Sequence, residues 1–331
     1  MSSIRQILVA VRALDASALP SVLKAAQLAR AFQAQLEIYH CLDTPLYSDL
    51  QTLGNRSLRE LERHLQQRAL RRLEAIADPL RRHHIKVAVR AAWDFPAYEA
   101  IIRRALRIKA DLIVAGVHAG RHRLPALMRL TDWELVRLSP VPLLLVKDSR
   151  AYRRPAVLAA VDPTHAFAKP LKLDQQILRF GGEVCQKLRG SLHAVHAYAR
   201  IPGGSFPEEA VTPAVVKTIV QDAQRAAQAR FERTLKKSRI TPAHRYLIGS
   251  DPVNAIADAA RRSRSAIVVM GAISRSGLKR WLIGNTAERI LDDLRCDALI
   301  VKPAGFRSRV PRAARGVQLL TAPLSGAFGY Y

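Results

Sequence analysis

Residues 266–303 read AIVVMGAISRSGLKRWLIGNTAERILDDLRCDALIVKP and decide the fold. The stretch opens with an apolar run of strand length that ends at Gly271, and a basic loop follows. The pattern restarts at Gly284 as the beginning of a helix, because Asn285 is followed three residues later by Glu288, as in a capping box. We therefore predict a strand, a loop and a helix start.

This arrangement is suited to binding an anion. Backbone N–H groups at a helix start have no partner within the helix, and they point toward a ligand placed there. Glycines in the loop let the backbone approach phosphate closely. Three basic side chains of the same loop are available to balance the ligand's charge: Arg275, Lys279 and Arg280.

Strands and helices alternate along the whole chain of 331 residues, which is long enough for about two domains. Such alternation predicts an α/β fold with parallel sheets covered by helices on both faces. We expect strands at 6–11, 36–42, 85–90, 112–116, 143–147, 156–161, 192–198, 245–248 and 266–271. Helices are expected at 17–32, over the Leu-rich stretch 58–76, and from Pro96, Thr131, Pro213, Pro252 and Asn285.

The two halves repeat one another. A shift of 155 positions lays DLIVAG, which ends at Gly116, onto AIVVMG, which ends at Gly271, and it carries Val146-Lys147 onto Val301-Lys302. The chain is therefore a tandem repeat of one α/β unit. We predict domains at 1–150 and 151–305, joined by a linker near 149–155, and a mobile basic tail at 306–331 in which no period continues.

Asp162 follows the first strand of the second half, and Gly271 follows its fourth. Ligands of open parallel sheets bind beyond the carboxyl ends of the strands, where the strand order reverses. With the order 3-2-1-4-5 these two strands are neighbours, so Asp162 and the glycine loop would flank one crevice. The alternative is that the glycines serve turn geometry only.

Gly271, Gly284 and Asn285 have the spacing of the universal stress protein pattern, G-x2-G-x9-G-[S/T], and the chain resembles that family over roughly residues 4–304. The stretches LTDWELVRLSPVPLLLVKD and IGNTAERILDDLRCDALIVKP resemble tandem members. The resemblance implies a Rossmann-like five-stranded parallel sheet of order 3-2-1-4-5 in each half and a tendency of domains to pair, within the chain or as a homodimer. Some members bind ATP in the crevice, and others have lost that capacity.

On this pattern the residues expected to bind ATP or another small anionic ligand are Asp162, Gly271, Ser274, Gly277, Gly284, Asn285 and Thr286. Two of them depart from the family pattern. Ser274 stands where the second glycine belongs, and Asn285 stands at the final Ser/Thr position, with Thr286 beside it. A hydroxymethyl group at Ser274 narrows the loop where a phosphate would approach.

The first half departs further. Its opening strand ends in Arg12 where the second half has Asp162, and Arg129 falls where the repeat places Gly284. Gly120 is retained one residue late. We expect that this half binds no nucleotide in the family's manner and serves as a packing partner.

The formal net charge of +26 suits polyanions, so a nucleic-acid-associated protein is the alternative function. The arginines are spread over both halves and lie mostly on polar helix faces, which favours a solvated surface instead. There is no apolar run long enough to span a membrane and no signal-peptide pattern, so we expect a cytoplasmic protein.

Catalytic and metal sites are not indicated. No nucleophile, base and orienting acid are assembled in the sequence, so we expect a protein that is not an enzyme, with a slow ATPase as a further alternative. The resemblance to universal stress proteins implies a role in stress survival. His118 and His122 are four residues apart but have basic neighbours, so no metal is expected. The three cysteines, Cys41, Cys185 and Cys296, are interpreted as reduced thiols.

Overall fold

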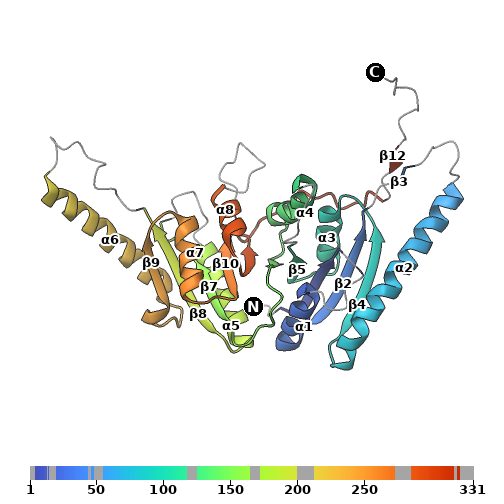
Figure 1. Cartoon of the computed structure of the whole chain (residues 1–331), viewed down its shortest axis with the longest axis horizontal. Helices are drawn as coiled ribbons and strands as arrows, with labels where there is room; N and C mark the ends of the chain where they lie inside the picture. Colours follow the sequence, from blue (N-terminus) through green and yellow to red (C-terminus); the bar gives the residue numbers. More distant parts are fainter. Residues whose placement is uncertain are drawn as a thin grey trace, which may run out of the picture. The chain divides into compact units, whose positions relative to one another are not determined.

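The computed structural model describes residues 4–12, 14, 20–43, 46–47, 55–117, 125–164, 172–199, 212–272, 285–316 and 319–320. The chain forms two compact units (Figure 1). Unit 1 comprises residues 1–141 together with 308–331, and unit 2 comprises residues 142–307.

Unit 1 is an α/β unit built on a parallel sheet of order β4-β2-β1-β5. Ile7, Leu8 and Val9 of its central strand are fully buried, as expected of a parallel strand covered on both faces. The strands are β1 (Gln6–Val11), β2 (Gln35–Leu42), β4 (Val87–Trp93) and β5 (Leu112–Gly116). The helices are α1 (Pro20–Phe32), α2 (Asn55–Arg82), α3 (Ala97–Arg107) and α4 (Pro125–Leu138). Two short strands, β3 (Leu46–Tyr47) and β12 (Leu319–Leu320), pair with each other.

Unit 2 repeats the design. Its parallel strands run in the order β9-β8-β7-β10-β11, which is 3-2-1-4-5 in chain order and confirms the predicted topology. The strands are β7 (Ala156–Ala160), β8 (Ser191–Tyr198), β9 (Arg245–Gly249), β10 (Ile267–Gly271) and β11 (Asp297–Val301). The helices are α5 (Leu173–Lys187), α6 (Pro213–Leu235), α7 (Pro252–Arg262) and α8 (Asn285–Asp293), with a short 3-10 turn η2 at Pro242–His244.

The strand predicted to complete the first sheet, β6 (Leu143–Val146), lies in unit 2. It runs antiparallel to β11, with Leu144 opposite Leu299. The apolar run LLLV specifies a buried strand, but it carries no information on which edge the strand joins or in which direction it runs.

The segment after β6 is fixed by a buried carboxylate. Asp297 has no exposed surface, and its Oδ1 accepts hydrogen bonds from the backbone N–H of Lys147 at 2.8 Å and of Asp148 at 3.1 Å. The hydroxyl of Tyr152 donates to Oδ2 at 2.5 Å. Lys147 Nζ donates to the carbonyls of Leu291 and Leu294, so a lysine satisfies carbonyl groups at the end of α8.

The described part of the predicted basic tail makes defined contacts with unit 1. Val310 is buried, and Arg103 of α3 donates to the carbonyl of Pro311 at 3.3 Å. The guanidinium of Arg315 pairs with both oxygens of Glu99, at 3.0 and 2.8 Å, and its backbone N–H donates to Asp94 at 2.8 Å. The polar anchors of the segment are thus a buried acidic pair and Arg103 on α3.

The three cysteines, all within the described residues, form no disulfide, as predicted. None of the described helices combines the length and the apolar character needed to cross a membrane.

Candidate functional site

Asp162 and Gly271 lie at the carboxyl ends of two neighbouring strands of unit 2. Strands β7 and β10 pair in parallel, with Ala159 opposite Val269. Asp162 follows the first of these strands by two residues, and Gly271 ends the second. The chain order reverses between them, which is where ligands of open parallel sheets bind. That these two residues contact a ligand stays a prediction.

The carboxylate of Asp162 is partly engaged by its own turn. Thr164 donates to Asp162 Oδ1 from its backbone N–H at 3.3 Å and from its hydroxyl at 2.5 Å. The backbone N–H of Asp162 in turn donates at 3.1 Å to Asp174, a buried residue in the first turn of α5. Among the described residues, no hydrogen bond reaches Oδ2 of Asp162, which leaves one carboxylate oxygen available to a ligand.

Gly271 has a packing role that does not depend on any ligand. A Cβ added at this position would lie 2.7 Å from Cδ2 and 3.2 Å from Cγ of Leu173, closer than carbon atoms approach. Because Leu173 is fully buried at the start of α5, a side chain here would force the Leu173 side chain to shift within the core. The glycine therefore favours the packing of α5 against β10, whatever it contributes to a phosphate loop.

Lys302 is a cation beside the end of β10 that the sequence analysis did not identify. It follows β11, whose Val301 lies opposite Gly271, and its Nζ donates to the carbonyl of Ala272 at 3.0 Å. Burial lowers the pKa of Lys302 to about 8. The repeat pair Val146-Lys147 and Val301-Lys302 was visible in the sequence, but a lysine after a strand does not reveal which carbonyl it reaches.

The remaining predicted residues of this crevice are only partly placed. Ser274, Gly277 and Gly284, with the basic side chains Arg275, Lys279 and Arg280, lie outside the described residues. Asn285 and Thr286 open α8, as predicted for the helix start, although nothing is described of their side chains. Their part in binding stays a prediction.

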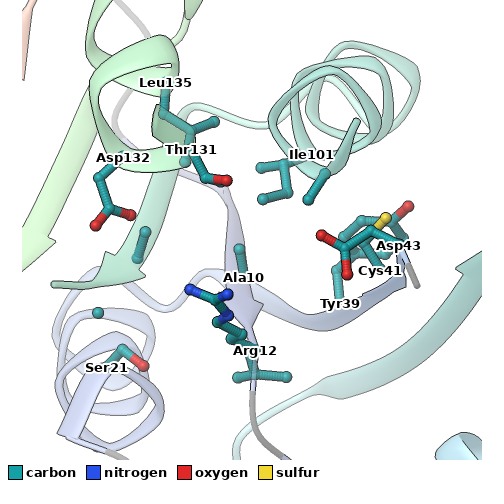
Figure 2. A pocket seen from close by; sticks show the side chains of 14 residues that line it. Ala10, Arg12, Ser21, Tyr39, Cys41, Asp43, Ile101, Thr131, Asp132 and Leu135 are labelled. Atoms are coloured by element: carbon teal, nitrogen blue, oxygen red, sulfur yellow. The ribbon is translucent and has the colours of Figure 1, made fainter. Parts of the chain in front are cut away.

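Unit 1 contains a cavity of about 100 Å³ at the carboxyl ends of β1 and β5 (Figure 2). Apolar side chains of α3 and α4, among them Ile101 and Leu135, form one part of its wall, and Gly116 ends the strand at its side. Polar side chains form the rest. They are Arg12, Ser21, Tyr39, Cys41, Asp43, Thr131 and Asp132.

Burial shifts the titration of several of these groups. It raises the pKa of Asp132 to about 6, against a smaller opposing effect of the nearby Arg12 charge. The pKa of Tyr39 is raised well above its ordinary value, mainly by burial. Burial also raises the pKa of Cys41 to about 12, so the thiol, which donates to the carbonyl of Asp94 at 3.1 Å, is neutral at physiological pH.

The model of the universal stress protein family matches the chain twice, at residues 3–147 and 157–302. The chain belongs to the universal stress protein family. Universal stress protein E of Escherichia coli K12 is 26% identical over 228 residues, which cover 68% of this chain and 71% of that protein. The homolog of universal stress protein E in Haemophilus influenzae is 24% identical over 234 residues, or 70% and 74% of the two chains.

Solved structures share the fold of this universal stress protein. A functionally unknown protein from Pseudomonas aeruginosa, PA1789, superposes with a TM-score of 0.66 at 23% identity, covering 91% of this chain and 93% of its own. A universal stress protein from Archaeoglobus fulgidus gives a TM-score of 0.59 at 15% identity, over 90% and 98% of the two chains. At these identities the likeness concerns the fold alone.

The two repeats of this universal stress protein present different chemistry at the same place in the sheet. Unit 2 has Asp162 after its first strand, whereas unit 1 has Arg12 there, as the sequence predicted. The acidic and hydroxyl side chains around Arg12 were not predicted. They come from α1, β2, the residue after β2, and α4, and no spacing in the sequence joins them.

Proposed function

We propose that this tandem universal stress protein is not an enzyme and acts in stress survival by binding a small anionic ligand, ATP or a related nucleotide, in unit 2. The observation that carries the proposal is the position of Asp162 and Gly271 at the ends of adjacent strands β7 and β10. The next element in the chain is α8, which begins at Asn285 and offers free N–H groups at its start.

Each group has a definite role in the proposal. Oδ2 of Asp162 accepts hydrogen bonds from the base or ribose, because Thr164 occupies only Oδ1. Phosphates lie on the loop before α8. Lys302 holds the first carbonyl of that loop, at Ala272, and adds a positive charge below a pH of about 8.

The test is titration calorimetry with ATP on the full chain. Saturable binding should be lost in Asp162→Ala and in Gly284→Arg, which places a side chain in the loop. Thr164→Val is the matched control, because it removes the hydrogen bond from the Thr164 hydroxyl to Asp162 but keeps the Asp162 carboxylate. Absence of heat at millimolar ATP, in wild-type protein with intact circular dichroism, would refute nucleotide binding.

The same preparations distinguish the other functions. ATP turnover above that of Asp162→Ala would instead assign a slow ATPase. The net charge of +26 is the observation that favours a nucleic-acid partner. That function requires retention on DNA or RNA at physiological salt, with an affinity that falls steeply as salt rises.

A further inference from the structure

Six polar side chains converge on the cavity of unit 1 and make no hydrogen bond or ion pair with any other described residue. Five structural segments supply them: the end of β1, helix α1, strand β2, the residue after β2, and helix α4. Figure 2 shows the labelled side chains around one space, with the Arg12 guanidinium extending into it. The six are Arg12, Ser21, Tyr39, Asp43, Thr131 and Asp132.

Two of the six are nearly inaccessible apart from the cavity. Tyr39 is 3% exposed and Ser21 is 7% exposed. Buried polar groups in folded proteins almost always have a hydrogen-bond partner, because an unsatisfied group loses its hydration without compensation. The hydroxyl and carboxyl groups therefore take their partners from within the cavity, either from water or from a bound molecule.

The size of the cavity limits the ligand. A cavity of roughly 150 Å³ holds benzene, which has six heavy atoms. The space in unit 1 is about 100 Å³, so it fits a molecule of about four to six heavy atoms. A nucleotide is several times larger than this volume.

The charges select among small ligands. One guanidinium, Arg12, lies between two carboxylates, Asp43 and Asp132, so the lining carries a net charge of one negative unit when all three are ionised (Figure 2). A small anion would be attracted by Arg12 alone and repelled by both acids. A molecule with a carboxylate and an ammonium group can pair with both signs.

We propose that the cavity of unit 1 binds a small zwitterion, a free α-amino acid such as glycine or alanine. Its carboxylate pairs with Arg12, and its ammonium group pairs with Asp132. The hydroxyls of Ser21 and Thr131 complete the hydrogen bonds, and a short side chain lies against Ile101 and Leu135. This site is separate from the nucleotide crevice proposed for unit 2 and does not depend on it.

Gly116 offers a variant that fills the cavity without breaking the fold. A Cβ at Gly116 would lie 3.6 Å from Oγ of Ser21, at ordinary van der Waals distance, so Gly116→Ala should fold normally. Gly182→Ala is the matched control, because its added methyl would lie 3.8 Å from Leu192 in unit 2, away from the cavity.

The experiment is titration calorimetry of the full chain with glycine and L-alanine. Acetate, ethylammonium and glycerol serve as probes that carry only one of the required groups. We expect saturable heat with at least one amino acid and at least tenfold weaker binding of the three single-group probes. Gly116→Ala, Arg12→Gln and Asp132→Asn should each weaken amino-acid binding at least tenfold, whereas Gly182→Ala should not.

Three outcomes would overturn the proposal. The first is no heat with any of the amino acids at 10 mM, roughly the upper end of weak specific binding. The second is acetate or glycerol binding as tightly as the amino acids, which would assign a carboxylate or polyol site. The third is binding that survives in all three cavity variants, which would place it elsewhere. Circular dichroism of each variant shows that a loss is not due to unfolding.

Discussion

His193 lies in the interior of unit 2, where its ring is 3.9 Å from that of His244 between centroids. Its ring nitrogens lie 3.0 Å from Ser191 Oγ and 3.5 Å from the hydroxyl of Tyr246. Burial, and to a lesser extent the charge of His244, lower the pKa of His193 to about 4. The protonated ring is thus disfavoured in the folded chain.

This shift predicts acid sensitivity of unit 2. Between pH 6.5 and 4 the unfolded chain binds the proton and the folded chain does not, so the free energy of unfolding falls as the pH falls. The loss should reach about 2 kcal/mol at pH 4.5. Urea unfolding at pH 7.5, 6.5, 5.5 and 4.5 measures it, and His193→Asn should flatten the dependence.

The control for His193 is His64→Asn, which removes an exposed histidine from α2. It should keep the wild-type pH dependence. If His193→Asn and His64→Asn change the slope equally, the acid sensitivity does not come from the buried ring.

Asp132 predicts a pH dependence of the free energy of unfolding with the opposite sign. Its pKa is about 6 in the folded chain and 3.8 in model compounds, so the folded state binds more protons between these values. Stability from this group is complete below pH 3.8 and is lost as the pH rises to 6. Asp132→Asn should therefore raise the free energy of unfolding by about 1 to 2 kcal/mol at pH 7.5, with no gain near pH 4.

Thermal and urea unfolding at both pH values test this, with Asp222→Asn on α6 as the control, since Asp222 is 63% exposed. An Asp132→Asn variant that is less stable than wild type at pH 7.5 would contradict the prediction. A carboxylate that lowers stability but lines a cavity fits a ligand site, where stability and function oppose each other.

At the scale of elements, the C-terminal segment and α3 form one structure. Glu99 and Asp94 are both about 5% exposed, and Arg103 pairs with both of them at 2.9 and 2.8 Å. Arg315 supplies a second guanidinium to Glu99. Two acids and two bases are therefore balanced, and removing one base leaves two buried carboxylates sharing a single cation.

Arg315→Ala should lower the stability of unit 1 by about 1 kcal/mol, because the guanidinium it removes is itself half exposed. Trypsin should also cut the segment 308–316 faster. Arg312→Ala is the matched control, since Arg312 is an exposed arginine three residues away. Equal protection from trypsin in both variants would show that the segment does not depend on the Glu99 pair.

The elements best predicted from sequence are those whose own residues fix them. β10 ends at Gly271 as predicted, because IVVMG is a continuous apolar run closed by the glycine that Leu173 requires. α7 starts at Pro252, where Asp251 caps the N–H groups of Val253 and Asn254. By contrast, α4 begins at Pro125, earlier than the predicted start near Thr131. Proline is favoured in the first turn of a helix, so Pro125 is the local signal that marks the true start.

The features that could not be predicted depend on residues far apart in the chain. The antiparallel pairing of β6 with β11, the anchors of Arg315 and the lining of the unit 1 cavity each bring together several segments. The glycine spacing between Gly271 and Gly284 lies within one short stretch and can therefore be recognised in the sequence. The predicted ATP residues Ser274, Gly277 and Gly284 remain a prediction that only ligand binding tests.

At the scale of the molecule, the two repeats share their order of strands and helices but differ in the contacts made at equivalent positions. The fourth strand of each repeat ends in glycine, but a methyl at Gly271 would collide with Leu173, whereas a methyl at Gly116 would meet Ser21 at an ordinary distance. The lysines after the fifth strands differ likewise: Lys302 holds Ala272, and Lys147 holds the end of α8. Residues at equivalent positions of the two repeats thus make different contacts, and each unit needs its own functional test.

The charge of the whole chain predicts how salt affects stability. The net charge is +26, so repulsion among basic side chains opposes the folded state, and added salt screens it. Many of the ion pairs are exposed and contribute little each, so their screening is the smaller effect. Raising NaCl from 20 to 300 mM should therefore raise Tm by about 2 to 4 °C, measured by scanning calorimetry.

The exposed face of α2 allows this to be tested with a matched change of charge. Arg68, Arg71 and Arg72 lie exposed within one and a half turns, and Arg68 faces Arg72 at the spacing where like charges repel. Replacing all three with glutamate lowers the net charge from +26 by six, to +20. The triple variant should melt at a higher temperature than wild type at 20 mM NaCl and gain less from added salt, while replacement with glutamine should give half the effect. A Tm that falls with salt in the wild-type chain would mean that ion pairs such as Glu99 with Arg315 outweigh the repulsion.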